Sequence, residues 1–304
     1  MKRFKTRWQE GGGKEFVDRL VYMGRSGNGF NVLESPFGMT EDGLLDFRGL
    51  CLPETAELRR VSFGPADFSA SSWARVWLER SRFDRADFAG ASFQVIGDHG
   101  NEFLSCRFSR TSFRGGVLGY RGSRFVSCAF DRADFSRALF VRPEFDDCEF
   151  RDCKLNGCDF NGASFERCRF MGELRDVWFR GGFALPADMS EYGVPRANRM
   201  TDVSFEGACL REATFSNGCD LSSVRIPKDG YHQLCAQWSQ RLKILQEIAR
   251  TWGPEARSAG SAFAAIHLVH ARTQDWFILN RRDLDEEYGR DVADLIWQSL
   301  VGTP

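Results

Sequence analysis

The sequence repeats every five residues between positions 123 and 170, which read, in groups of five, SRFVS CAFDR ADFSR ALFVR PEFDD CEFRD CKLNG CDFNG ASFER CRF. The third residue of each group is phenylalanine or leucine, and the first is small in most groups. An α-helix repeats every 3.6 residues and a strand every 2, so neither explains a period of five. The chain must instead turn a corner once in every group.

The same step extends in both directions from this stretch. The upstream centres are Phe47, Leu52, Leu58, Phe63, Phe68, Trp73, Leu78, Phe83, Phe88, Phe93, Phe103, Phe108, Phe113 and Leu118, with a break at Asp98 and a two-residue insertion after Leu118. The repeat returns after a long interruption at Phe205, Leu210, Phe215, Leu221 and Ile226. The 28 phenylalanines against five tyrosines agree with a repeat architecture, because an ordinary core is less skewed.

Four stretches match a known motif, A(D/N)LXX. They are Ala66-Asp67-Phe68, Ala86-Asp87-Phe88, Ala133-Asp134-Phe135 and Cys158-Asp159-Phe160. On these residues the chain resembles the pentapeptide-repeat family, and the resemblance covers roughly 60% of the chain. It implies a mainly β protein, a right-handed four-sided β-helix that uses four pentapeptides in each coil.

The sequence itself supports four sides. Sorting the centres into four faces places only phenylalanine in one column: Phe47, Phe68, Phe88, Phe108, Phe130, Phe150 and Phe170. A second column holds Phe63, Phe83, Phe103, Phe125, Phe145 and Phe165, and leucine gathers in a third with Leu58, Leu78 and Leu118. About seven coils stacked at a strand spacing of about 4.8 Å give a rod about 35 Å long. Such a rod is stiff, and its filled interior offers no substrate cavity.

Three domains are expected. Residues 1–44 form an N-terminal cap, a β-hairpin of Phe16 to Met23 and Phe30 to Leu33 joined through the glycine-rich residues 24–29. Residues 45–226 form the solenoid, interrupted by an insertion loop at 171–200. Residues 227–304 switch to a helical period and form a C-terminal helical cap or dimerisation domain of three helices, the second near Pro254 and the third near Asp283.

Composition narrows the functional classes. Lysine and arginine number 41 and aspartate and glutamate 42, so bulk charge indicates neither nucleic acid nor an anionic membrane as a partner. No apolar run approaches the roughly 20 residues of a membrane span, and the basic N-terminus continues into glycines instead of a signal core. We expect a cytoplasmic protein that binds no nucleic acid directly and no membrane.

The ten cysteines are interpreted as structural. Cys106, Cys128, Cys148 and Cys168 fall in one stacked column, at the small inward position that Ala66 and Ala86 hold in earlier coils, and buried cysteine acts as a small hydrophobe. A disulfide between stacked coils and a metal cluster are the alternatives. Cys51 and Cys209 do not fit this position and are expected to be accessible.

No catalytic, cofactor-binding or metal site is expected. His267 and His270 lie three residues apart on a predicted helix without an evident third ligand. His99 lies beside Asp98 in a break that reads as a bulge or loop, and neither a phosphate-binding loop nor a nucleophile elbow is present. We therefore expect a protein that is not an enzyme.

Partner-binding residues are expected on the third face and in the insertion. Apolar, aromatic and arginine side chains meet on that face, which is the composition of a binding hot spot: Trp77, Val117, Leu139 and Val141, with Tyr120, Arg60, Arg80 and Arg142 at the corners. The alternative is that the N-terminal segment covers this strip. The insertion is too long and too aromatic for a simple connector, since it contains Trp178, Phe179 and Phe183, and it is either a lid or a binding arm.

These features favour a non-catalytic protein–protein interaction scaffold. The resemblance implies an alternative, because some members of the family protect type II topoisomerases such as DNA gyrase by imitating duplex DNA with outward carboxylates. Here the outward residues of the all-phenylalanine column have mixed sign: Asp46, Asp67, Asp87, Arg107, Ala129, Glu149 and Arg169. Mixed signs imitate a phosphate backbone poorly. The family also implies that the C-terminal helices can form a homodimer.

Overall fold

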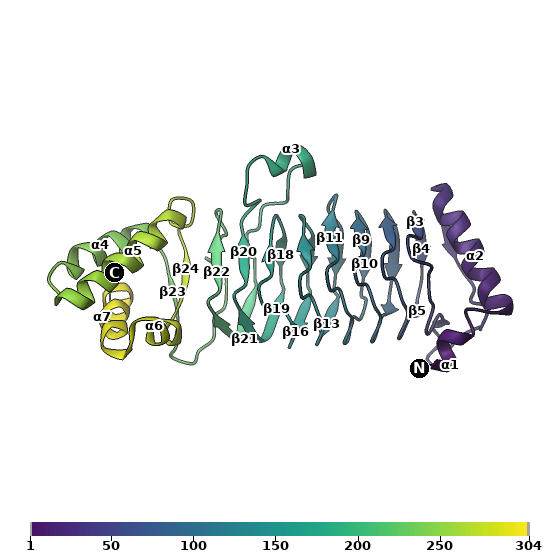
Figure 1. Ribbon diagram of the computed structural model, residues 1–304, viewed down its shortest axis with the longest axis horizontal. Helices are drawn as coiled ribbons and strands as arrows, with labels where there is room; N and C mark the ends of the chain where they lie inside the picture. The colour runs from purple at the N-terminus through teal and green to yellow at the C-terminus, as the bar shows by residue number, and fades with distance from the viewer. Residues whose placement is uncertain (1, 303–304) are drawn as a thin grey trace.

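The computed structural model describes residues 2–302, so the outermost residues of both predicted end domains lie outside it. It shows a rod of stacked coils with helices at each end (Figure 1). The strands of neighbouring coils pair in parallel, about twenty residues apart, as in Phe83 with Phe103. The predicted parallel β-solenoid is confirmed, and it has about seven turns.

Four sets of strands or bridges form the sides of the rod. The first face is a seven-stranded sheet of β1 (Phe30–Val32), β4 (Val61–Phe63), β7 (Arg82–Asp84), β10 (Glu102–Leu104), β12 (Arg124–Val126), β15 (Glu144–Asp146) and β18 (Ser164–Glu166). The second face holds β2 (Leu45–Asp46), β5 (Ala66–Asp67), β8 (Ala86–Asp87), β13 (Ala129–Asp131), β16 (Glu149–Arg151), β19 (Arg169–Arg175) and β21 (Ser204–Arg211).

The other two faces differ in regularity. The third face consists of β3 (Glu57–Arg59), β6 (Trp77–Glu79), β9 (Gly97–His99), β11 (Val117–Tyr120) and β14 (Leu139–Phe140), and it continues through β17 (Asp159–Phe160), β20 (Trp178–Arg180) and β22 (Thr214–Ser216). The fourth face is held by single parallel bridges that join Cys51, Ser72, Ser92, Ser112, Asp134 and Lys154 in turn.

The corners use left-handed backbone. Arg60, Arg80 and Arg142 have φ values of 55°, 48° and 53°, and residues at equivalent corners behave alike. A left-handed residue turns the chain through the corner within five residues, although it costs energy for any residue but glycine. Stacking on the neighbouring coils holds these corners in place, and most of them carry a polar side chain, although Ala70 and Val95 do not.

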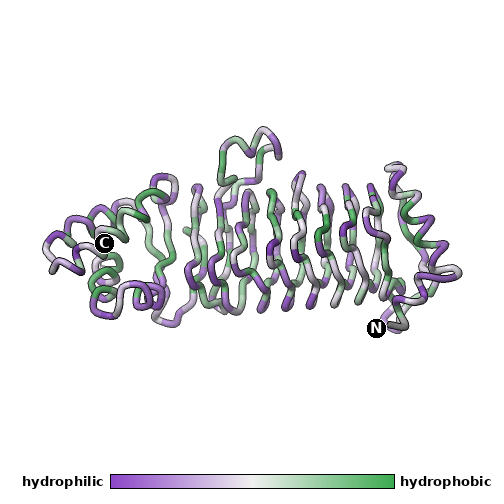
Figure 2. The backbone as a smooth tube through the Cα atoms, viewed as in Figure 1, coloured by the Kyte–Doolittle hydropathy of each residue, from purple (hydrophilic) through white to green (hydrophobic). Residues whose placement is uncertain are grey.

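The predicted phenylalanine columns fill the core. Phe130 stacks between Phe108, at 4.9 Å between ring centroids, and Phe150, at 4.8 Å, with interplanar angles of 6° and 8°. Rings of neighbouring faces meet edge to face, as Phe63 and Phe68 do at 5.1 Å. Hydrophobic and hydrophilic residues alternate along each coil (Figure 2). Both ring geometries are the favourable ones for aromatic pairs, so the columns stabilise one another.

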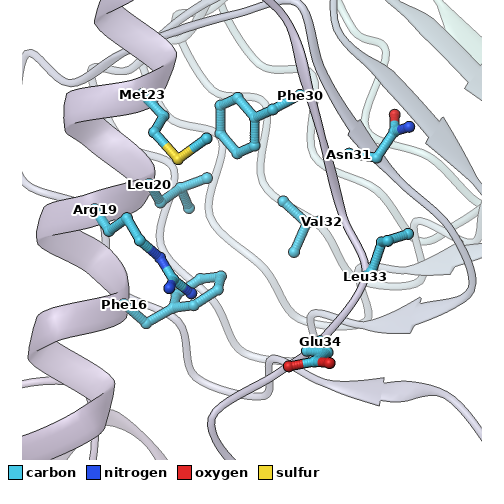
Figure 3. A pocket seen from close by; sticks show the side chains of 9 residues that line it. All are labelled: Phe16, Arg19, Leu20, Met23, Phe30, Asn31, Val32, Leu33 and Glu34. Carbon is cyan, nitrogen blue, oxygen red and sulfur yellow. The ribbon is translucent and has the colours of Figure 1, made fainter.

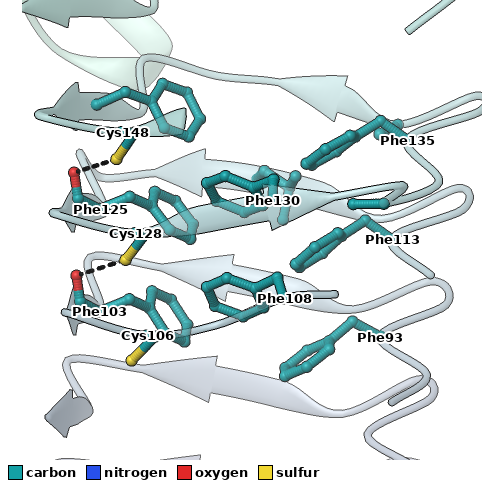
Figure 4. Packing of buried hydrophobic residues seen from close by; sticks show 14 of the residues in the cluster. Phe93, Phe103, Cys106, Phe108, Phe113, Phe125, Cys128, Phe130, Phe135 and Cys148 are labelled. Atoms are coloured by element: carbon teal, nitrogen blue, oxygen red, sulfur yellow. Dashed lines mark hydrogen bonds between the residues drawn. The ribbon is translucent and has the colours of Figure 1, made fainter. Parts of the chain in front are cut away.

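The stacked cysteines lie beside these rings. Cys106, Cys128, Cys148 and Cys168 are buried free thiols, and each donates to the main-chain carbonyl of a phenylalanine in the preceding coil. Figure 4 shows two of these bonds, from Cys128 to Phe103 and from Cys148 to Phe125. The distances from Sγ to the carbonyl oxygen are 3.2–3.5 Å. Burial raises the pKa of Cys128 and Cys148 far above the usual range of a thiol. Cysteine therefore fills the small inward position and also satisfies a carbonyl.

The N-terminal segment differs from the prediction. Residues Gly11–Ser26 form a helix, α2, preceded by α1 (Lys2–Thr6), so the expected strand from Phe16 to Met23 is wrong. Phe16, Val17, Leu20 and Gly24 lie on one helical face and cover the end of the core, with the Phe16 ring 5.4 Å from that of Phe47. Strand β1 belongs to the first face, so the solenoid begins before residue 45.

The interruption is shorter than predicted. Met171 lies in β19 and Trp178 in β20, whereas Met200 is fully buried, so the repeat leaves its path only at residues 181–199. The step from Phe170 to the next buried centre, Leu174, is four residues instead of five, and this shift hid the repeat in the sequence. Phe170 and Phe205 still stack at 5.1 Å. We call residues 181–199 the excursion; it contains α3 (Asp188–Tyr192).

The C-terminal region has its own small core. It consists of α4 (Trp238–Ala249), α5 (Pro254–His270), α6 (Arg281–Tyr288) and α7 (Arg290–Val301), one helix more than predicted, with an antiparallel pair of strands, β23 (His232–Cys235) and β24 (Phe277–Asn280). Side-chain hydrogen bonds to main-chain groups attach it to the last coil: Gln274 bonds the nitrogen and oxygen of Cys219, and Asn280 donates to the oxygen of Leu210. No helix within residues 2–302 is long and apolar enough to cross a bilayer.

Candidate partner-binding face

The outward residues of the third face form an exposed apolar strip. The register aligns Trp77, Gly97, Val117 and Leu139 on four successive strands. Leu139 is 62% exposed and Trp77 is 41% exposed. We call Trp77, Val117 and Leu139 the third-face strip. Because β6 and β11 are paired on both sides and β14 is paired with β11, the strip is presented on a rigid surface.

Gly97 allows the tryptophan ring to lie flat on the strip. A Cβ atom at position 97 would come within 3.3 Å of the Trp77 ring and 3.2 Å of the His99 ring. The rings of Trp77 and His99 stack with centroids 3.6 Å apart and an interplanar angle of 23°. Any larger residue at position 97 would push these rings apart, so glycine fits this place for a packing reason.

A row of rings continues from the strip to the excursion. His99 meets Tyr120 at 4.6 Å, Tyr120 meets Tyr192 at 5.7 Å, and Tyr192 meets Phe183 at 6.0 Å. The guanidinium of Arg142 donates to the main-chain oxygen of Val194 at 3.1 Å. The excursion therefore folds back toward the third face, and its residues Tyr192 and Val194 adjoin the row of rings there.

The arginines of this face converge on one carboxylate. Glu79 accepts a hydrogen bond from Arg121 at 3.2 Å and from the Trp77 indole nitrogen at 3.3 Å. Its carboxylate also lies 3.6 Å from Arg59 and 3.9 Å from Arg80. Three arginines around one glutamate leave a positive balance beside an apolar strip, and such pairs near a surface are worth little energy each.

Below the strip, a polar group replaces one leucine of the third column. Asp98 is buried and accepts hydrogen bonds from Asn101 Nδ2, from Ser123 Oγ at 2.7 Å and from the Gly119 main-chain nitrogen at 2.8 Å. Gly119 adopts a φ of 84° inside the two-residue insertion. The break at Asp98 and the insertion after Leu118 are thus one structural feature, because the inserted turn supplies a donor to the buried carboxylate.

Burial shifts two titrating groups here in opposite directions. Loss of solvation raises the pKa of Asp98 to about 6, although its three hydrogen bonds oppose the rise. Loss of solvation lowers the pKa of His99 to about 4, so its ring is neutral at neutral pH. The two side chains point to opposite sides of β9, which is a strand. Its pairing with β11 shifts register between Val117 and Tyr120, so the break is an irregularity in strand pairing, as the expected bulge would be, and not a loop. They do not form an acid–base pair.

The eight predicted binding residues do not all lie together. Trp77, Tyr120, Leu139, Arg80 and Arg142 lie on or beside the strip. Trp178 lies on the same face but farther along the rod, where its ring contacts Arg180 and His270.

Two of these residues are buried, which corrects the prediction for the insertion. Phe179 is a core residue of the repeat, stacked between Phe160 and Phe215, so it is unavailable to a partner. Phe183 is buried against Gly162 and supports the excursion from below.

The N-terminal segment does not cover the strip. Gly24 of α2 packs on Glu57 and Leu58, at the end of the third face, and leaves Trp77 and Leu139 exposed. Sequence reasoning missed His99 and Tyr192 as members of the ring row. The sequence offered one signal for His99, because it follows the outward Gly97 by two residues. It offered no signal for Tyr192, since the position of Tyr192 depends on how the excursion folds back.

Comparison with known proteins agrees with this geometry. The family model described as pentapeptide repeats, in eight copies, matches residues 121–157 and 144–172. The chain is a pentapeptide-repeat protein. A search of curated proteins found no match.

Solved structures of pentapeptide-repeat proteins resemble this one distantly. QnrB1, a plasmid-mediated fluoroquinolone resistance protein, shares 16% identity with a TM-score of 0.36, over 57% of this chain and 80% of that chain. HetL, which is involved in heterocyst differentiation regulation in the cyanobacterium Nostoc, shares 14% identity with a TM-score of 0.21, over 60% and 85%. Rfr23 of the cyanobacterium Cyanothece shares 12% identity with a TM-score of 0.22, over 60% and 87%.

Proposed function

We propose that this pentapeptide-repeat protein is a non-catalytic scaffold that binds another protein through the third-face strip and the adjoining side of the excursion. The alignment of Trp77, Val117 and Leu139 on one face, with Trp77 and Leu139 exposed and Val117 half-buried, is the observation that supports it. Tryptophan and arginine are enriched at interface hot spots. The strip is held by paired strands, so little conformational entropy is lost when a partner binds.

Outward charges on the first face alternate instead of forming a negative stripe. Glu102 pairs with Arg82 at 2.7 Å and with Arg124 at 3.8 Å, and Glu144 lies between Arg124 and Arg196. A DNA mimic needs carboxylates in continuous rows, because it must replace the phosphates of a duplex. The charge pattern therefore favours the general scaffold over topoisomerase binding by imitation of DNA.

The test is binding of a partner from the native host by the double variant Trp77→Ala, Leu139→Ala. Loss of two central apolar anchors should weaken binding at least tenfold, because hot-spot truncations cost about 2 kcal/mol or more each. Met39→Ala is the matched control, since Met39 is as exposed as Leu139 but lies at the N-terminal end. Equal binding by the double variant and the control would contradict the proposal.

We also propose a homodimer through the C-terminal helices. Ile266 and Val269 on α5 are 58% and 61% exposed, and they lie close together on one helix. Sedimentation of the parent chain and of Ile266→Asp tests this, and a dimer that the variant dissociates is expected. A monomeric parent chain at all concentrations would refute it.

A further inference from the structure

The first face of the rod ends in a strand with one free edge. The main-chain nitrogen of Phe30 donates to Arg60, and β1 pairs in parallel with β4 from Phe30 to Val32. Main-chain groups alternate in direction along a strand, so Phe30 and Val32 direct theirs to β4, whereas Asn31 and Leu33 direct theirs away. Among the described residues, no strand pairs with β1 on that side.

A groove lies between this edge and α2. It has a volume of about 340 Å³ and is lined by Phe16, Leu20 and Met23 from the helix and by Phe30 and Val32 from the strand. Figure 3 shows Phe30 and Val32 directed toward α2, whereas Asn31 and Leu33 point the other way. The groove thus combines an apolar floor with an unpaired row of main-chain donors and acceptors.

The groove continues along the helix. A second hollow shares Phe16, Arg19 and Glu34 with the first and extends to Gly12 and Pro36. From Gly12 to Met23 a helix rises about 16 Å at 1.5 Å per residue, which is the length of about five extended residues at 3.3 Å each. The available length therefore fits a short β-strand.

One cation, Arg19, and one carboxylate, Glu34, line the groove. Arg19 lies on α2 between Phe16 and Leu20, with its guanidinium 5.8 Å from the centre of the Phe16 ring. No carboxylate of the described chain forms an ion pair with it. A ligand with a carboxylate opposite Arg19 would gain a charge-assisted hydrogen bond.

The thickness of α2 decides which ligand fits. A helix is about 10 Å across, which equals about two strand spacings. Because α2 is thicker than a strand, it extends beyond the free edge of β1, and a ledge remains beside it along that edge. A second copy that brought its own β1 to this edge would bring its own α2 into the same space. A single extended segment fits the ledge without that clash.

We propose that the free edge of β1 and the groove against α2 bind an extended peptide segment of another protein as an added strand. Every second side chain of the segment faces α2. Two of these side chains are apolar and pack on Phe16, Leu20 and Met23, and the one between them is acidic and lies opposite Arg19. Main-chain hydrogen bonds to Asn31 and Leu33 supply affinity, and the alternate side chains supply specificity. This surface lies at the end of the rod and is independent of the third-face strip.

The test uses a fluorescein-labelled peptide, Thr-Val-Thr-Asp-Thr-Leu-Thr-amide, and the full chain, with fluorescence anisotropy as the measurement. Asn31→Pro removes the outward main-chain donor, a change that edge strands tolerate, and Asn31→Ala is its matched control because it keeps the donor. Arg19→Glu reverses the groove charge, and Arg25→Glu makes the same change on the same helix outside the groove.

We expect the parent chain, Asn31→Ala and Arg25→Glu to bind alike, whereas Asn31→Pro and Arg19→Glu bind at least about tenfold more weakly. A peptide with lysine in place of aspartate should regain affinity for Arg19→Glu. Hydrogen exchange on the parent chain should slow at the Asn31 and Leu33 amides when the peptide is added, and this readout does not depend on any variant folding.

Three results with the peptide would overturn the proposal. They are absence of peptide binding up to about 1 mM, unchanged exchange at the Asn31 and Leu33 amides, and equal affinities of Asn31→Pro and Asn31→Ala. Sedimentation showing a dimer that Arg19→Glu dissociates would also overturn it, because the edge would then be occupied by a second copy.

Discussion

Replacing Phe130 by alanine tests the phenylalanine core most severely. Its ring is 1% exposed and stacks on Phe108 and Phe150 at 4.9 and 4.8 Å. Truncating a buried phenylalanine costs about 3–5 kcal/mol, and more where the cavity cannot collapse. Strand β16 pairs with β13 on one side, and a bridge from Arg107 to Ala129 holds the other side, so the cavity stays open. The two lost stacks, worth about 0.5–1.5 kcal/mol each, are part of this cost and place it in the upper half of the range, so we expect a loss of about 4–5 kcal/mol.

Urea unfolding followed by circular dichroism measures this loss. At a slope of about 3 kcal/mol per molar urea, the midpoint should fall by about 1.5 M. Leu139→Ala is the control from a neighbouring position of the rod, and because Leu139 is 62% exposed it should change stability by less than about 0.5 kcal/mol. A Phe130→Ala midpoint within about 0.3 M of the parent would refute the assignment of this column to the core.

Three further predictions concern thiols, pH and the excursion. Thiol labelling of the folded chain should modify Cys51 rapidly and the buried cysteine column only after unfolding, since all four thiols of the column are buried and burial raises the pKa of Cys128, Cys148 and Cys168; fast labelling of the column would contradict this. The pKa of Asp98 rises from 3.8 to about 6 on folding, so its stabilising contribution is complete below about pH 4 and is lost as pH rises through 6, by about 3 kcal/mol. Asp98→Asn should remove that part of the pH dependence of urea unfolding, and an unchanged profile would show that Asp98 ionises freely. Replacing residues 184–196 by a short glycine–serine linker should keep the β signal in circular dichroism, whereas replacing 171–200 should disrupt the coil because Leu174 and Phe179 are core residues; equal stability of the two deletions would contradict the boundaries of the excursion.

The sequence predicted the regular part of the fold well. A five-residue period with phenylalanine at its centre permits few structures, and residue segregation into columns gave the four faces. Two features escaped it for physical reasons. Phe16, Val17 and Leu20 fit a strand or a helix equally, and only packing over Phe47 selects the helix. The one-residue shift after Phe170 disguised Leu174 and Phe179 as parts of a loop.

The candidate face was predicted in outline but not in detail. The five-residue period identifies the outward apolar residues of one column, so it predicted that Trp77 and Leu139 lie on the same face. The row of rings could not be predicted from the period, because it depends on Gly97 leaving room for His99 and on the excursion bringing Tyr192 to Tyr120. Contacts between segments far apart in sequence follow from tertiary folding and leave no local signal.

Photocrosslinking from the third face tests the central proposal most directly. A benzophenone amino acid placed at Val117, in the middle of the third-face strip, should give a covalent adduct with the partner in cells of the native host. The same group placed at Arg107, which faces outward on the second face, should give none. An adduct from Arg107 but not from Val117 would contradict the proposal that the third face is where this protein binds its partner.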